Sequence, residues 1–228
     1  MSTGVPRSVR TVPPVEPGAT RVVLVRHGEA ACNVNGVVGG PVGCTGLTDR
    51  GREQVGALAA RLAETGELRG ATALYASVLP RAVETARLLG PSVGTGALAV
   101  RRRCSLCELH PGQSDGLAWR DAVGRFGEPD WDADPSTPLA PGGESWSAFV
   151  ARAAAGVAAV AADHPGETVV VACHAGVVEA TLVSWLGVSR PRLQLRTAHA
   201  SMTEWERSAG GWRLVRYNDA AHLVAVGD

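Results

Sequence analysis

The chain contains no lysine and no isoleucine, so arginine supplies every cationic side chain apart from histidine. Its 22 basic and 22 acidic residues cancel to a formal net charge of zero, which removes any bulk electrostatic argument for a nucleic acid or an anionic membrane as a partner. No apolar run approaches the roughly 18 residues that a membrane-spanning helix needs. The many Ala, Gly, Val and Arg residues are typical of a GC-rich bacterial genome.

Cysteine is scarce, and its number is odd. With no apolar core of a signal peptide near the start, this pattern predicts reduced thiols and a cytoplasmic protein. Cys104 and Cys107 form a single C-x-x-C motif, which is weak evidence for zinc without a second pair. We therefore expect no bound metal and no cofactor. The five residues are Cys32, Cys44, Cys104, Cys107 and Cys173.

The 228 residues are enough for one domain with a sizeable core or for two small domains. Residues 1–20 contain four prolines and two glycines and no apolar helix pattern, so they predict a disordered tail. Residues 21–228 are predicted to form one domain.

Apolar runs of strand length alternate with segments of helical spacing in this domain. Such alternation predicts an α/β fold in which a mostly parallel central sheet is covered by helices on both faces, a three-layer α/β/α arrangement. A hairpin is expected over 201–206 and 212–217. The other predicted strands are 21–25, 71–76, 97–101 and 168–172, and the predicted helices are 48–64, 80–89, 117–126, 145–162 and 177–186.

Two of the predicted strands end in a histidine that is followed closely by glycine. The first run stops at Arg26-His27-Gly28, and the second stops at Cys173-His174-Ala175-Gly176. Ligands of open α/β sheets bind beyond the carboxyl ends of the strands. If both strands are central and parallel, the two histidines face the same crevice. Two histidines and an arginine suit an anionic substrate and chemistry near neutral pH.

Arg81 and Glu108 are further candidates. Arg81 follows a strand and stands at the start of a helix, where a phosphate group is favoured by the helix end and by the arginine fork. Glu108 lies among turn residues with glycines four and eight positions further on. Taken alone, the first is more often a surface charge and the second a solvated carboxylate, so both depend on the rest of the pattern.

Together these motifs resemble the histidine phosphatase superfamily, whose fold is phosphoglycerate mutase-like. The resemblance covers essentially residues 21–228, and the order of its motifs makes it specific. The matching segments are Arg26-His27-Gly28-Glu29 with Asn33, Leu47-Thr48 with Gly51 and Gln54, residues 77–86, Glu108 with its glycines, Pro141-Gly142-Gly143-Glu144-Ser145, and the segment around His174. The closing Tyr217-Asn218-Asp219 with His222-Leu223 also looks like members of this group.

The resemblance implies a role for each residue. His27 is expected to take the phosphoryl group on a ring nitrogen, because neutral imidazole is a competent nucleophile at pH 7. Glu108 is expected to protonate the leaving oxygen and then to deprotonate the attacking water. The remaining residues are expected to hold the phosphoryl oxygens without a metal ion: Arg26, Arg81 and His174, with Asn33 and the amides near Ala175.

The resemblance leaves three functions open. Phosphomonoester hydrolysis is favoured over a phosphoglycerate-type mutase, because only about 33 residues separate Glu108 from Gly142, whereas family mutases typically have a longer insertion there. A non-catalytic scaffold or sensor is the third alternative. We expect a small phosphate ester as the partner, no nucleic acid and no membrane, and a homodimer as the candidate assembly.

Substrate preference is expected to depend on two segments. Residues 34–46 depart from the common pattern, since Thr45-Gly46 precede Leu47 where many relatives have Asp-x-Pro-Leu. We expect this loop to border the substrate, and residues 119–131 to form the opposite wall or simply to pack as a lid. Three cysteines close to the proposed site, Cys32, Cys107 and Cys173, are interpreted as buried packing residues, with a redox brake as the alternative.

Overall fold

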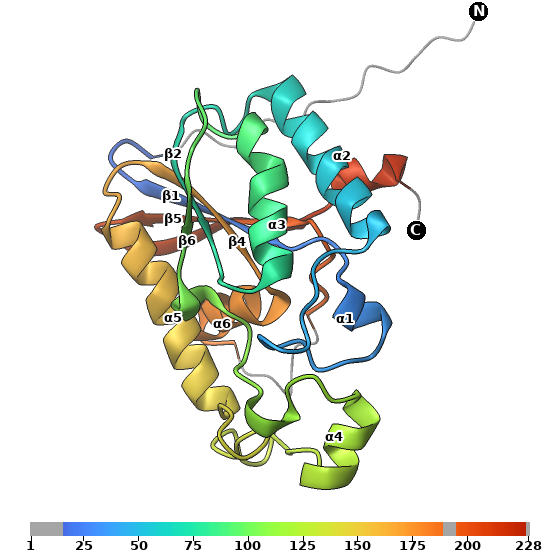
Figure 1. The fold of residues 1–228 in the computed structure, drawn as a ribbon. Coiled ribbons are helices and arrows are strands. Elements are labelled where there is room, and N and C mark those ends of the chain that lie inside the picture. The colour runs from blue at the N-terminus through green and yellow to red at the C-terminus, as the bar shows by residue number, and fades with distance from the viewer. Residues whose placement is uncertain (1–15, 189–194, 227–228) are drawn as a thin grey trace, which may run out of the picture.

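One sheet at the centre of the domain sets the positions of all other elements (Figure 1). The computed structural model describes residues 16–188 and 195–226. The described strands are ordered β3-β2-β4-β1-β5-β6, and β5 alone runs against the others, so the predicted mostly parallel sheet is confirmed. The strands are β1 (Thr20–Arg26), β2 (Ala71–Ala76), β3 (Val100–Arg102), β4 (Thr168–Cys173), β5 (Met202–Ser208) and β6 (Gly211–Asp219).

Helices cover both faces of the sheet, which confirms the three-layer arrangement. On one face lie α2 (Asp49–Thr65) and α3 (Pro80–Leu89), and on the other lie α5 (Trp146–Ala162) and α6 (Ala175–Leu186). The short α1 (Ala31–Val34) follows β1, and α4 (Trp119–Phe126) is set apart from the sheet at the lower end of Figure 1. Within the described ranges, no helix is both long and apolar enough to cross a membrane.

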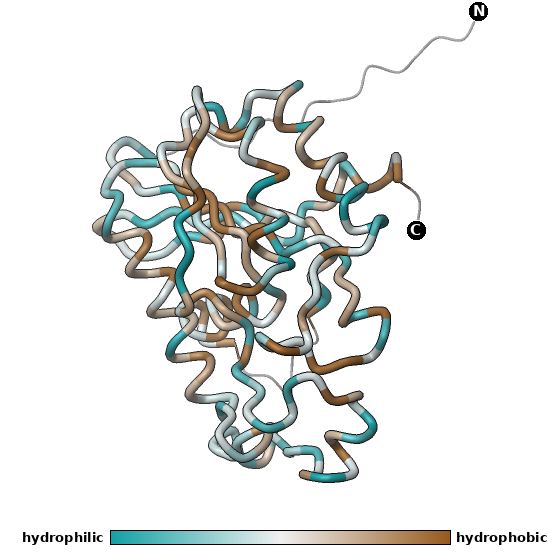
Figure 2. The backbone as a smooth tube through the Cα atoms, viewed as in Figure 1, coloured by the Kyte–Doolittle hydropathy of each residue, from teal (hydrophilic) through white to brown (hydrophobic). Residues whose placement is uncertain are grey.

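The four inner strands have apolar side chains on both faces, as expected for a sheet buried between two helix layers. Val22 and Leu24 of β1 pack toward Phe149 of α5, whereas Val23 and Val25 pack toward the α2 and α3 layer. In Figure 2 the strands at the centre of the domain show long hydrophobic stretches, and the segments around α4 are more hydrophilic. Two apolar layers therefore fix the sheet from both sides.

Several predicted boundaries differ from the structure. The predicted tail lies outside the described residues as far as residue 15, and Thr20 already belongs to β1. The edge strand β3 begins at Val100 and not at 97, because it pairs only with the last three residues of β2. Helix α6 begins at Ala175, two residues early, and α1 was not predicted because four residues show no helical period.

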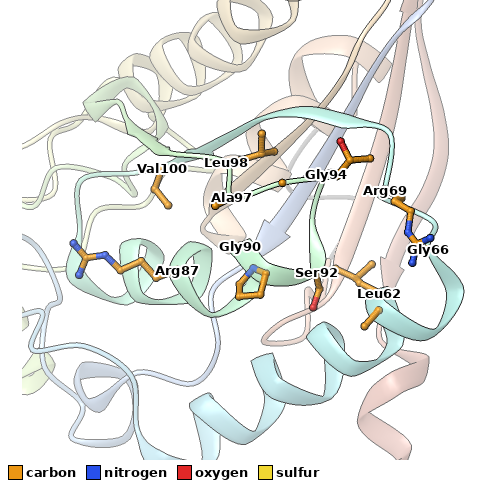
Figure 3. A pocket seen from close by; sticks show the side chains of 14 residues that line it. Leu62, Gly66, Arg69, Arg87, Gly90, Ser92, Gly94, Ala97, Leu98 and Val100 are labelled. Atoms are coloured by element: carbon orange, nitrogen blue, oxygen red, sulfur yellow. The ribbon is translucent and has the colours of Figure 1, made fainter.

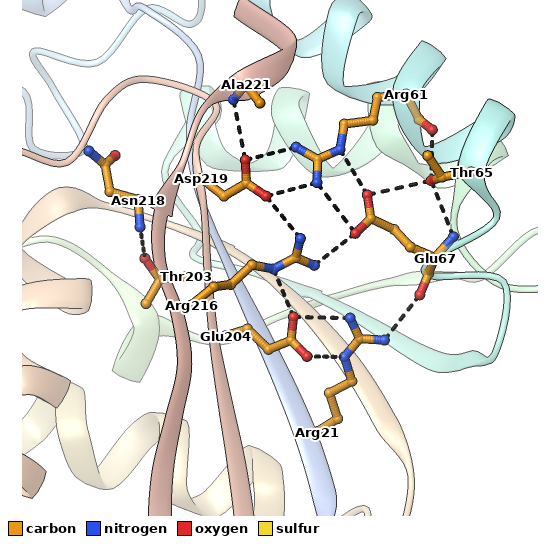
Figure 4. Close-up of polar contacts among 10 residues, drawn as sticks. All are labelled: Arg21, Arg61, Thr65, Glu67, Thr203, Glu204, Arg216, Asn218, Asp219 and Ala221. Atoms are coloured by element: carbon orange, nitrogen blue, oxygen red, sulfur yellow. Dashed lines mark hydrogen bonds and ion pairs between the residues drawn. The ribbon is translucent and has the colours of Figure 1, made fainter. Parts of the chain in front are cut away.

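A network of buried and partly buried charged residues crosses the face of the sheet under α2 (Figure 4). Arg21 of β1 donates two hydrogen bonds to Glu204 of β5, and Arg216 of β6 lies 2.8 Å from the same carboxylate. Arg61 of α2 binds Glu67 at 2.9 Å and Asp219 at 2.8 Å. The network pairs three arginines with three carboxylates. Each charge that folding removes from water therefore has an oppositely charged partner, which offsets the desolvation cost.

The turn after β1 depends on a close approach between two glycines. Gly28 follows β1, and Gly51 lies in the first turn of α2. A Cβ on Gly28 would overlap the Gly51 carbonyl, and a Cβ on Gly51 would overlap the Glu29 carbonyl. Helix α2 is fixed there because the Thr48 hydroxyl caps it by accepting a hydrogen bond from Gly51 N–H at 2.9 Å. The first turn of α2 therefore supports the segment that follows His27.

We expect Gly51→Ala to lower the free energy of unfolding by about 1–3 kcal/mol, because the new methyl group must displace the Glu29 carbonyl. Gly56→Ala is the matched control, since Gly56 lies in the same helix with no atom near its Cβ position. That control should stabilise the protein by about 0.5–1 kcal/mol. Urea unfolding of both variants measures the difference, and equal stability of the two would contradict the packing argument.

Candidate active site

Pairing between β1 and β4 brings the two predicted histidines together. Arg26 and Cys173 are register partners in this parallel pair, so His27 and His174 leave the sheet side by side. The backbone N–H of His27 donates to the Cys173 carbonyl at 2.9 Å. The two imidazole rings lie 5.2 Å apart between centroids in an edge-on arrangement. The two histidines therefore lie side by side at the carboxyl ends of β1 and β4. A shared crevice in front of them stays a prediction.

His27 is held in one tautomer by its neighbours. Its Nδ1 lies 2.6 Å from the Gly28 carbonyl, which can only accept, so Nδ1 bears the proton. Arg81 Nε donates to His27 Nε2 at 3.1 Å, so that nitrogen has the lone pair. Burial and the nearby Arg81 and Arg26 cations hold the pKa of His27 well below its ordinary value. The ring is therefore neutral, with its lone pair on Nε2.

Arg81 reaches this nitrogen from the first turn of α3. Pro80 occupies the first position of that helix, where a missing N–H does no harm, and the Arg81 side chain that follows is 4% exposed. Its Nη1 donates to the Gly39 carbonyl at 2.6 Å. A buried guanidinium held by two contacts provides a fixed positive charge beside His27.

His174 is held by Ser77. The Ser77 hydroxyl accepts from Leu79 N–H at 3.2 Å and forms a hydrogen bond of 2.7 Å with His174 Nε2. The other ring nitrogen, Nδ1, is buried and has no hydrogen-bond partner among the described residues. Burial, followed by the charge of Arg81, keeps the pKa of His174 well below its usual range.

Arg26 is positioned by a segment that the sequence analysis did not select. Its guanidinium donates to the Thr197 carbonyl and, at 2.7 Å, to His199 Nε2. The His199 ring lies 5.7 Å from the His27 ring, and burial lowers the pKa of His199 to about 4. Arg26 Nε is buried without a partner in the part of the chain that the structure describes. His199 lies in no periodic segment, so the sequence offered no signal for it.

The side chain of Glu108 reaches the first turn of α6, which follows His174. Its Oε2 accepts from Gly176 N–H at 3.1 Å, and its Oε1 accepts from Leu109 N–H at 3.2 Å. A Cβ on residue 176 would overlap the carboxylate, so glycine is needed there for Glu108 to approach. The charge of Glu108 also acts on Arg26, whose pKa is lowered by burial and raised by this carboxylate.

The two remaining predicted residues lie at the edge of this group. Asn33 belongs to α1, its side chain is exposed, and its amide oxygen accepts from Ala30 N–H at 3.2 Å. Ala175 is the first residue of α6, directly after His174. Their part in phosphate binding stays a prediction.

The two expected substrate-bordering segments contact each other. Val37 forms an antiparallel bridge with Ala118, and Trp119 N–H donates to the Gly36 carbonyl at 2.9 Å. The Asp115 carboxylate accepts from two amides of the loop, Val42 N–H and Gly43 N–H, both at 2.9 Å. The segment with α4 is therefore fastened to the loop 36–43, which also touches Arg81 through Gly39.

The three cysteines near the site are all buried. Cys32 Sγ lies 3.9 Å from Arg81 Nη1. Burial raises the pKa of the Cys173 thiol, so that thiol stays protonated. For Cys32 and Cys173, these observations agree with the interpretation as packing residues.

A separate cavity of about 790 Å³ lies at the opposite ends of the strands (Figure 3). It is lined by residues from the end of α2, the end of α3 and the segment before β3, among them Leu62, Arg69, Arg87 and Leu98. None of the predicted site residues lines it. The chemistry indicated by the histidines therefore belongs to the carboxyl ends of β1 and β4.

The chain is similar to several known proteins. It is 29% identical over 218 residues to a metal-independent phosphoserine phosphatase from Arabidopsis thaliana, covering 93% of this chain and 87% of that protein. A mycobacterial glucosyl-3-phosphoglycerate phosphatase, solved with VO3, matches with a TM-score of 0.70 at 28% identity, covering 87% of this chain and 99% of that one.

A 2,3-bisphosphoglycerate-dependent phosphoglycerate mutase from Mycobacterium tuberculosis is 35% identical over 123 residues, covering 53% of this chain and about half of the mutase, 48%. The family model of the histidine phosphatase superfamily, branch 1, matches residues 22–220, which include both histidines, both arginines and Glu108. With the paired histidines at the strand ends, this match shows that the chain belongs to the histidine phosphatase superfamily.

Proposed function

We propose that this protein hydrolyses the phosphomonoester of a small metabolite through a phosphohistidine on His27. One observation supports this most directly. Two buried polar atoms next to His27 have no partner among the described residues: Arg26 Nε, which can only donate, and His174 Nδ1. Buried polar groups are almost always hydrogen-bonded, so a ligand with oxygens that accept from Arg26 is the natural partner. A phosphoryl group is such a ligand.

In the first step, the lone pair on His27 Nε2 attacks phosphorus, and the bond from phosphorus to the ester oxygen breaks. The proton on Nδ1 remains hydrogen-bonded to the Gly28 carbonyl, so this carbonyl stabilises the positive charge that develops on the ring. Because the pKa of free His27 is depressed, the nucleophile stays neutral even below the ordinary pKa of histidine. Falling pH therefore does not protonate it until well below that value.

The positive groups around His27 stabilise the transition state. Arg81 and Arg26 are held by backbone carbonyls at Gly39 and Thr197, so little reorganisation is needed when charge builds up on the phosphoryl oxygens. His174 donates from Nδ1 while Ser77 holds its other nitrogen. Arg81 Nε, which contacts Nε2 in this structure, is placed to move onto a phosphoryl oxygen once Nε2 bonds to phosphorus.

Glu108 supplies and then recovers the proton. In its protonated form it donates to the leaving ester oxygen, which departs as an alcohol. The resulting carboxylate accepts a proton from water as that water attacks phosphohistidine, and inorganic phosphate is released. Histidine returns with its lone pair on Nε2, so the cycle closes.

Two other carboxylates of the sequence are engaged elsewhere, which favours Glu108. Asp115 accepts hydrogen bonds from Val42 and Gly43 N–H. Glu144 is bound by Arg152, with nitrogen to oxygen distances of 2.7 Å to each carboxylate oxygen. Only Glu108 among these three acts on Arg26 in the site.

The substrate can be sought by a screen of phosphate esters. The screen should contain phosphoserine and glucosyl-3-phosphoglycerate, the compounds named in two relatives, together with sugar phosphates. A parallel phosphoglycerate mutase assay, with and without a bisphosphate primer, tests the alternative suggested by the mutase relatives. Release of inorganic phosphate without isomerised product is the result expected for a hydrolase.

We expect rapid acid-free quenching with a labelled ester to trap a phosphoprotein that is labile to acid and stable to base, because phosphorus is bound to nitrogen. His27→Gln should yield no label and lose turnover. In Glu108→Gln, an activated aryl phosphate should still load His27, and label should accumulate because the attacking water lacks its base. Near-normal turnover by His27→Gln would disprove the mechanism.

We expect Glu108→Gln to slow esters of poor leaving groups by about 10²–10⁴-fold, the usual contribution of a general acid. Aryl phosphates with good leaving groups need no proton, so their first step should be affected far less. Measuring burst and steady-state rates on both ester types separates loading from water attack. Equal losses in the loading step would instead point to Asp115 or Glu144.

We expect hydrolysis to continue in excess chelator, because Arg26, Arg81 and the two histidines already surround the phosphoryl position with donors. The assay compares the initial rate of the untreated protein with that of protein dialysed against chelator and assayed in its presence. Complete loss of activity that a single divalent ion restores, in this protein and equally in a Cys104→Ser variant without the intact C-x-x-C motif, would argue against this mechanism.

A further inference from the structure

A second group of reactive side chains lies on the segment that leads into Glu108. Cys104 and Cys107 are brought to one side by the 3-10 turn η2 (Cys104–Leu106), in which Cys107 N–H donates to the Cys104 carbonyl at 3.0 Å. His110 folds back so that its Nε2 lies 3.4 Å from Cys104 Sγ. The two sulfur atoms and one ring nitrogen all lie within 4.8 Å of one another.

We propose that Cys104, Cys107 and His110 bind a thiophilic divalent cation, with Zn²⁺ as the best match and water as the fourth ligand. Zinc bonds of about 2.3 Å to sulfur and about 2.1 Å to nitrogen at tetrahedral angles place a sulfur and a nitrogen about 3.6 Å apart. The observed distance of 3.4 Å between Cys104 Sγ and His110 Nε2 is close to this expected separation. Each thiol gives its proton to the solvent when the ion binds.

The other nitrogen of His110 faces a carboxylate, as metal-binding histidines require. The ring atom Nδ1 of His110 lies 3.7 Å from Glu144 Oε2, and the backbone N–H of His110 donates to the same oxygen at 2.9 Å. A carboxylate on this side orients the ring and directs Nε2 toward the ion. Glu144 is itself fixed by Arg152. This is independent of the sulfur geometry and indicates the same use of His110.

Arg152 also holds the backbone of the segment in place. Its Nη1 donates to the carbonyls of Cys104, Ser105 and Cys107 at 3.3, 3.1 and 3.1 Å, and its Nη2 donates to the Glu108 carbonyl at 3.2 Å. The turn is therefore shaped before an ion arrives. Cys104 is exposed, which gives the ion a path from solvent.

The proposed ligands are none of the residues assigned to phosphoryl transfer, so the metal site does not depend on the proposed function. The two sites are neighbours, because Cys107 directly precedes Glu108. The sequence spacing alone was weak evidence because it showed one cysteine pair, and the fold adds the third ligand three positions after Cys107.

Cobalt substitution tests the site. The full-length protein is reduced, stripped with chelator, freed of chelator and titrated with Co²⁺. We expect one equivalent to produce thiolate-to-cobalt charge transfer and the visible bands of tetrahedral cobalt, and Zn²⁺ to abolish both. Zn²⁺ should also raise the unfolding temperature, because it binds only the folded arrangement. No thiolate charge transfer in the fully reduced protein would overturn the proposal.

Variants separate this site from the other thiols. Cys104→Ser and His110→Ala should each lose the tetrahedral spectrum, and Glu144→Gln should weaken binding by about 10–100-fold, as other partners of ligating histidines do. Cys44→Ser is the matched control and should keep the spectrum. Far-UV circular dichroism is the control that checks whether each variant is folded. Full binding by Cys104→Ser would refute the site, and phosphatase assays of the same samples report on the proposed function separately.

Discussion

The in-register pairing of β1 with β4 is the constraint on which the active site depends. Arg26 lies opposite Cys173, so the histidines that follow the two strands occupy matching register positions next to each other. A slip of one residue would turn the side chains of one strand to the opposite face of the sheet and separate the rings. Apolar layers on both faces fix this register, because Val22 and Val23 must each reach a different helix layer.

The site concentrates positive charge around two histidines that are kept neutral. Burial and the two arginines both disfavour protonation of His27, and hydrogen bonds then select the tautomer. Ser77 holds His174 through the contact of 2.7 Å with its Nε2. The neutral His27 ring among fixed cations keeps a lone pair available on Nε2. A polar cluster of this kind needs rigid support, which α3, the loop 36–43 and the segment 197–201 provide.

Much of this arrangement could be predicted from the sequence because strand ends mark it. His27 and His174 each close an apolar run, and Arg81 follows a proline at a helix start, so their placement needs only local patterns and parallel pairing. His199 could not be found this way. It reaches Arg26 through a long-range pairing in which Ala200 N–H donates to the His27 carbonyl. The buried Arg21 and Glu204 were equally hidden, since alternating charges in a strand usually indicate a solvent-facing side.

The contacts between α4's segment and the loop 36–43 have a consequence for how new specificities arise. Asp115, Ala118 and Trp119 bind backbone groups of the loop, so the two walls hold one another independently of the sheet. A change in the length of either wall breaks hydrogen bonds in the other. If these two segments border the substrate, as expected from the sequence, a substrate preference is transferred from a relative only by exchanging both segments as one unit.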